Sequence, residues 1–130
     1  MPFRRASCQK SKSLRAFYEE VAADSHVVVG EAGRLMTELV DDLEQAFRDI
    51  PVWGLTSHFH LMLLAADDSA TPWFVSVTPP VGGSFTIDYL LPEFEAPWPN
   101  ARVTGEAKSV KAAVEMVLLA IEKSRGWEKK

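Results

Sequence analysis

The spacing of apolar residues changes near Pro51, and this change constrains the fold more than any other feature of the chain. Between residues 31 and 50, apolar side chains recur every three or four positions, which is the period of an amphipathic helix. From Gly54 onward they alternate with other residues, which is the period of a strand. Pro51 separates the two patterns because the residue before a proline is driven out of the helical region. The chain therefore combines helices with a sheet.

The same two periods divide the rest of the chain into elements. We predict helices over residues 13–23, 31–49 and 106–124, and strands over residues 54–64, 73–78 and 85–91, with a short fourth strand over residues 102–104. The apolar stretch 26–30 fits either a short strand or a link packed under the next helix. The order α-α-β-β-β-(β)-α predicts an α+β fold, in which an antiparallel sheet of three to four strands carries two N-terminal helices and one C-terminal helix.

Length and cysteine content set the domain organisation and the expected compartment. A chain of 130 residues that is 47% hydrophobic is large enough for one domain with its own core. We expect a flexible basic tail over residues 1–12 and a single α+β domain over residues 13–130. Cys8 is the only cysteine, which excludes an internal disulfide and favours a reducing, cytoplasmic location. No apolar run is long enough to span a membrane, so we expect no membrane partner.

The formal net charge of −4 conceals three blocks of different sign. Residues 1–15 carry five basic groups and no acidic one, and residues 102–130 carry seven basic groups against four acidic ones. Between them, residues 16–101 carry 14 acidic groups against two basic ones. An acidic body repels nucleic acid, whose binding depends on neutralising phosphates. It attracts a positively charged protein instead, so we expect no nucleic acid to bind the folded core.

Two groups of residues are candidates for binding a partner. Glu38, Asp41, Asp42 and Asp49 lie opposite the apolar face of the second predicted helix. Such a run is either a solvated helix face or a docking surface for a basic partner. Phe94 and Trp98 lie in a segment with three prolines. These aromatic rings either pin the segment to the core or offer contact area to a partner.

His58 and His60 form the only metal-like spacing in the chain, because residues two apart on a strand project to the same side. Asp88 is the natural third ligand, but in a simple meander one strand separates it from His60, so the two backbones stand ~10 Å apart. The alternative is two polar residues on a partly exposed sheet face. This second sheet face mixes apolar and polar residues, so it is either covered by another element, such as the first helix, or an interface. A pocket lined by Trp53, Trp73 and Tyr89 is a third possibility.

No catalytic signature stands out in the sequence: it lacks a phosphate-binding loop, a nucleophile elbow and a calcium loop,. We therefore expect no cofactor and favour a binding protein over an enzyme. The leading hypothesis is a small, acidic, non-catalytic protein-binding domain of the immunity, inhibitor or chaperone kind, which docks on a protein partner or on itself. The alternative is a metal-binding protein or metal-dependent enzyme that uses the His58–His60 pair.

Overall fold

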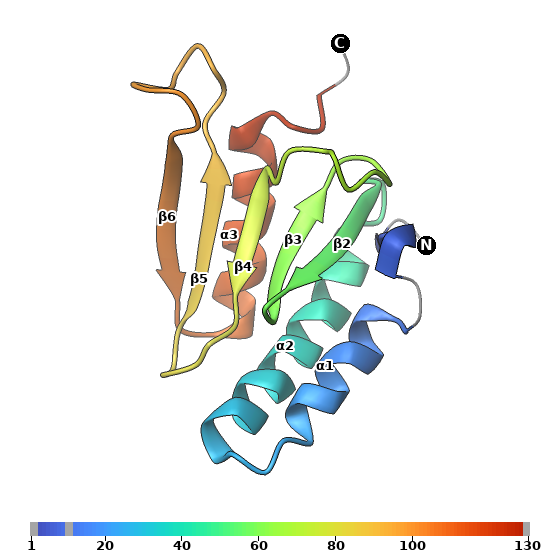
Figure 1. Ribbon diagram of the computed structural model, residues 1–130. Helices are drawn as coiled ribbons and strands as arrows, with labels where there is room; N and C mark the ends of the chain where they lie inside the picture. Colours follow the sequence, from blue (N-terminus) through green and yellow to red (C-terminus); the bar gives the residue numbers. More distant parts are fainter. Residues whose placement is uncertain (1–2, 10–11, 129–130) are drawn as a thin grey trace.

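A computed structural model describes residues 3–9 and 12–128 and shows an α+β fold (Figure 1). The helices are α1 (Leu14–Ala22), α2 (Val27–Ala46) and α3 (Val110–Ser124), and a short 3-10 helix, η1, spans Ser7–Gln9. The strands are β1 (Phe3–Arg5), β2 (Val52–Ser57), β3 (His60–Leu64), β4 (Val75–Thr78), β5 (Phe85–Leu90) and β6 (Arg102–Ala107). The α+β class, the two N-terminal helices and the C-terminal helix are confirmed.

The strands form one sheet in the order β1-β2-β3-β4-β5-β6. All neighbours from β2 to β6 are antiparallel, whereas β1 lies parallel to β2. The three helices lie behind this sheet in the view of Figure 1 and leave its front face without a helical layer. The sheet is larger than the three to four strands predicted, for two separate reasons.

The first reason is that the long strand predicted over residues 54–64 is a hairpin. β2 ends at Ser57, β3 begins at His60, and these two residues pair across the hairpin. The turn residues His58 and Phe59 have positive φ angles of 51° and 69°, as a two-residue type I′ turn requires. Such turns usually carry Asn-Gly. His58 and Phe59 occupy the two turn positions instead, so the sequence shows no sign of a turn here. The reversal also puts Leu55 on the opposite face from Leu61, contrary to the single dry face predicted.

The second reason is that part of the expected basic tail is folded. Phe3 and Arg5 pair with Val52 and Gly54 of β2, and Phe3 packs edge-on against Phe47 with ring centres 5.2 Å apart. Burial of this ring supplies apolar area that a mobile tail would leave in water. The remaining tail residues, 1–2 and 10–11, lie outside the described residues, so the prediction of a flexible tail stays a prediction there.

The main core lies between the helices and the covered sheet face. Its fully buried side chains come from α1, α2, the strands and α3, and include Tyr18, Met36, Leu43, Leu63, Val77 and Val117. The predicted second face is partly covered, but not by the first helix: Leu55, Met62 and Leu64 form a smaller buried cluster there with Ala6 and Trp53. The β3–β4 segment also crosses in front of this end of the sheet (Figure 1).

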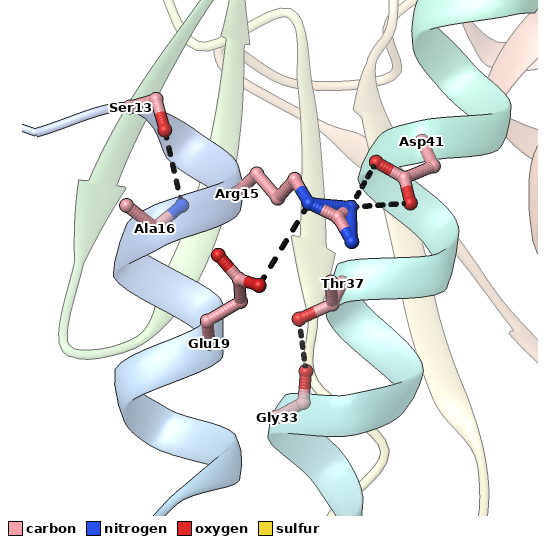
Figure 2. Close-up of polar contacts among 7 residues, drawn as sticks. All are labelled: Ser13, Arg15, Ala16, Glu19, Gly33, Thr37 and Asp41. Carbon is pink, nitrogen blue, oxygen red and sulfur yellow. Dashed lines mark hydrogen bonds and ion pairs between the residues drawn. The ribbon is translucent and has the colours of Figure 1, made fainter.

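Helix α1 instead packs side by side with α2. Ser13 caps α1 by accepting a hydrogen bond from the Ala16 amide at 3.1 Å, as its position before the apolar pattern predicts. Arg15 reaches across to the carboxylate of Asp41 at 2.7 Å (Figure 2). The undecided stretch 26–30 opens α2, with His26 as its N-cap residue. Within the described residues, no helix combines the length and apolar character that a membrane crossing needs.

Candidate functional site

Two long loops and the end of α3 lie together at one end of the sheet, at the top of Figure 1. The β3–β4 and β5–β6 connections meet there because antiparallel strands return every second loop to the same end. Leu90, the last residue of β5, ties the base of the second loop to the first by donating a backbone hydrogen bond to the Phe74 carbonyl at 2.8 Å. We call residues 65–74, 91–100 and 124–128 the acidic loop end.

The acidic loop end exposes three large aromatic side chains. Phe94 is 72% exposed, Trp98 67% and Trp73 44%. The sequence allowed Phe94 and Trp98 either to pin their segment to the core or to face a partner. Their exposed fractions do not fit the first interpretation. The sequence predicts Trp73 at the start of a strand over residues 73–78. It lies in the loop because β4 begins only at Val75. Exposed aromatic rings in one place are typical of interaction surfaces.

The segment that carries Phe94 and Trp98 is held by its own backbone. The carbonyl of Pro92 accepts hydrogen bonds from the amides of Glu95 and Ala96 at 2.9 and 3.0 Å. The base of the loop is closed by a bond from the Leu91 amide to the Ala101 carbonyl at 2.9 Å. Proline also fixes its own φ angle. The loop therefore presents its rings with little conformational freedom left to lose on binding.

A hollow of about 720 Å³ lies between this loop and the end of α3. Phe74 and Leu90 contribute apolar walls, and Phe94, Trp98 and Arg125 border it. The guanidinium of Arg125 lies over the Phe94 ring, 5.2 Å from its centre, while its Nε donates to Glu128 at 2.9 Å. An aromatic face and a carboxylate thus already hold one guanidinium within the chain, an arrangement favoured by cation–π attraction.

The two loops carry four acidic residues, Asp67, Asp68, Glu93 and Glu95, and no lysine or arginine between residues 65 and 74 or 91 and 100. Asp67 accepts hydrogen bonds from the amide and the hydroxyl of Ser7, and these bonds lower the pKa of its carboxyl group. Within the described part of the chain, neither Glu93 nor Glu95 forms an ion pair. The two loops therefore contribute only negative charge around the aromatic rings, and Arg125 is the one basic residue of the acidic loop end.

The structure divides the acidic residues that were predicted on the second helix. Asp41 accepts two hydrogen bonds from Arg15 of α1, at 2.9 and 2.7 Å, and Glu38 pairs with Arg34 at 3.1 Å. Much of the predicted docking stripe is therefore balanced within the chain. Asp42 and Asp49 are exposed, and Asp49 lies beyond α2, which ends at Ala46. Asp49 comes two residues before Pro51, whose carbonyl accepts a hydrogen bond from Trp127 in the acidic loop end.

The structure does not bring His58, His60 and Asp88 together. His58 lies in the β2–β3 turn, and the Nδ1 atom of His60 lies 3.1 Å from the Thr78 hydroxyl. Asp88 is two strands away and accepts hydrogen bonds from Ser76 at 2.7 Å and Arg102 at 2.5 Å. Across residues 3–9 and 12–128, no group of three or more histidine, cysteine, aspartate or glutamate side chains is placed to hold a metal ion.

A second hollowed region surrounds the β2–β3 turn at the opposite end of the sheet. Phe59 is 52% exposed and borders both an apolar cavity of about 440 Å³ and a more polar one of about 560 Å³. Arg5 lines the polar cavity, with its guanidinium over the Phe17 ring. The pocket suggested between Trp53 and Tyr89 does not form, because the strand register puts these two residues on opposite sheet faces.

We expect the double substitution H58N/F59G to raise the free energy of unfolding by about 1 kcal/mol. Left-handed backbone costs about 1–2 kcal/mol per ordinary residue, and asparagine and glycine tolerate it, although glycine adds freedom to the unfolded chain. Urea unfolding monitored by circular dichroism measures the change. Phe59→Ala is the control, because it removes the ring and keeps the strain. A double variant less stable than this control would contradict the expectation.

Comparison with known proteins does not place the chain in a family. No protein-family model matches it, and no curated protein or solved structure matches it at a significant level.

Proposed function

We propose that this chain is a non-catalytic protein-binding domain that docks on a basic surface of its partner through the acidic loop end. The observation that carries the proposal is the exposure of Phe94 and Trp98 on a loop held by its own hydrogen bonds, beside a hollow of about 720 Å³. Tryptophan is among the residues that contribute most to protein interfaces. A loop that is already ordered loses little entropy on binding.

The charge of the loops supports a basic partner. Glu93 and Glu95 flank Phe94 directly, so a lysine or arginine that reaches the ring also meets a carboxylate. The contact between Arg125 and Phe94 shows the geometry that a guanidinium adopts on this ring. Complementary charge chiefly raises the rate of encounter and excludes wrong partners. The remaining exposed acids on the same side of the chain, such as Asp49, extend the negative field.

The first test measures binding of a synthetic arginine-rich peptide by the change in intrinsic tryptophan fluorescence. We expect the double substitution F94A/W98A to weaken binding at least about tenfold, since truncating a hot-spot residue costs about 2 kcal/mol or more and about 1.4 kcal/mol is tenfold. Binding to the unaltered chain is expected to weaken as salt is added. Since W98A removes one fluorophore, isothermal calorimetry provides the affinity of the variant.

The matched control is V27A/V28A, which truncates two exposed apolar residues at the start of α2, far from the acidic loop end along the fold (Figure 1). This pair should leave the affinity for the peptide unchanged. Equal weakening by both double variants would mean that exposed apolar area in general, and not this loop, attracts the peptide. Tighter binding of a glutamate-rich peptide than of the arginine-rich one would refute the charge argument.

A further inference from the structure

Strand β6 is a long, open sheet edge. It pairs with β5 over all six of its residues, and within the described residues no other strand lies on its outer side. Figure 1 shows it as the outermost strand, with nothing drawn beside it. The opposite edge, β1, has only three residues. Proteins usually shorten or cover such edges, because unpaired backbone groups are a template for another strand.

An exposed apolar strip lies beside this edge on the helix side of the sheet. Val103 is 40% exposed and Leu119 of α3 is 51% exposed. Met116 packs where a side chain at Gly105 would lie, with its methyl group 2.7 Å from the position of an added Cβ. Leu119 follows Met116 by three residues, so the two are neighbours on the surface of α3, which runs opposite to β6 behind the sheet (Figure 1). We call Val103, Met116 and Leu119 the edge strip.

The sequence of β6 is complementary to itself in one antiparallel register. Residues directly opposite each other in antiparallel strands point to the same face, so a symmetric pairing of two β6 strands is centred on a residue. When the pairing is centred on Thr104, Arg102 of each copy lies opposite Glu106 of the other, so the register forms two contacts between opposite charges. Centred on Gly105, it places Thr104 opposite Glu106 and gains no opposite charges.

The conformation of the chain already suits this register. The Nε atom of Arg102 is held on the open face by Asp88 at 2.5 Å. Glu106 is exposed and forms no ion pair within the described residues. The partner copy would therefore supply the cation that Glu106 lacks. On the other face, the same two-fold axis brings the two edge strips together beneath the joined strands.

We propose that two copies of this chain pair through β6 in the register centred on Thr104, joining their sheets and burying both edge strips. The contact uses the same patch on both copies, so it closes as a two-fold dimer. The paired strands run in opposite directions, which points the two acidic loop ends away from each other. This surface is separate from the proposed partner-binding end and adds to the proposed function a second copy as partner.

Sedimentation equilibrium of the full chain over a range of micromolar concentrations tests the dimer. We expect reversible dimerisation of the unaltered chain and at least a tenfold weaker dimer for Glu106→Arg and for Arg102→Glu, since each places like charges opposite each other (about tenfold per 1.4 kcal/mol). Mixing these two variants restores opposite charges at both contacts. The mixture should therefore form a heterodimer, although neither variant dimerises well alone.

Leu119→Lys provides a variant that leaves both charges intact, because Arg102→Glu also removes the ion pair with Asp88. It should weaken the dimer, whereas Val81→Lys, at an exposed apolar position in the β4–β5 loop, should not. Thermal unfolding verifies that each variant is folded. A chain that stays monomeric at the highest concentration, or a dimer indifferent to both Leu119→Lys and Glu106→Arg, overturns the proposal. F94A/W98A should remain dimeric, which separates this test from the test of partner binding.

Discussion

Replacing Gly33 with alanine is expected to lower the free energy of unfolding by about 3 kcal/mol, the upper part of the range for overpacked interiors. Gly33 lies in α2 where α1 crosses it. A Cβ added there would stand 2.3 Å from the amide nitrogen of Ala22 and 2.6 Å from the carbonyl carbon of Val21. Both are backbone atoms, so no side chain can rotate away. The two helices must separate instead.

The direction of this effect opposes helix propensity. Alanine in a helix interior is favoured over glycine by about 1 kcal/mol, so a solvent-exposed position would gain stability from the same change. Gln45→Ala, an exposed α2 position, is the control and should change stability by less than about 0.5 kcal/mol. Urea unfolding of both variants gives the comparison. A Gly33→Ala variant as stable as the unaltered chain would show that the helices cross farther apart than described.

The helices and the central strands could be predicted because their apolar periods extend over many residues. The pattern of α2 is long enough to fix its core face, and Ser13 marks the start of α1 by a recognisable cap. β1 was missed because three residues carry no usable period. The β2–β3 turn was missed because His58 and Phe59 have no turn propensity. Their left-handed backbone is maintained by tertiary contacts, including the hydrogen bond from Tyr18.

The candidate site could be predicted only in part. Phe94 and Trp98 attract attention in the sequence because prolines surround them, but their exposure depends on how the loop folds. Trp73 joins them only through the strand order, which brings the two loops to one end. The acids of α2 illustrate the opposite case: Arg15, 26 positions before Asp41, balances that carboxylate across a helix pair. No local pattern reveals such a pairing.

Replacing Tyr18 with phenylalanine is expected to reduce stability at neutral pH by about 1–2 kcal/mol and to change how stability responds to alkali. Tyr18 is fully buried, and its hydroxyl donates a hydrogen bond to the Phe59 carbonyl at 2.8 Å. Removing the hydroxyl leaves this part-buried carbonyl without its partner, and the expected loss lies in the lower part of the range of about 1–3 kcal/mol for an unsatisfied acceptor. Thermal and urea unfolding at neutral pH measure this loss of stability.

The expected loss of stability at high pH follows from the pKa of Tyr18. Burial raises the pKa of its hydroxyl well above the ordinary value, and the positive charge of Arg5 offsets this only in part. The folded state therefore keeps its proton where the unfolded chain has lost it. This contribution to stability is complete below about pH 10, the unfolded pKa, and falls above it by about 1.4 kcal/mol per pH unit until the folded pKa is reached.

The difference in stability between the unaltered chain and Tyr18→Phe should consequently shrink as the pH rises above about 10. Phe59→Ala is the control, since it retains both the hydroxyl and the carbonyl, and its difference from the unaltered chain should stay constant over the same pH range. A constant difference for Tyr18→Phe as well would mean that the hydroxyl titrates alike in the folded and unfolded chain. Because Tyr18 anchors the β2–β3 turn through the Phe59 carbonyl, the protection of the amides of residues 57–60 relative to the unfolded chain should fall over the same pH range.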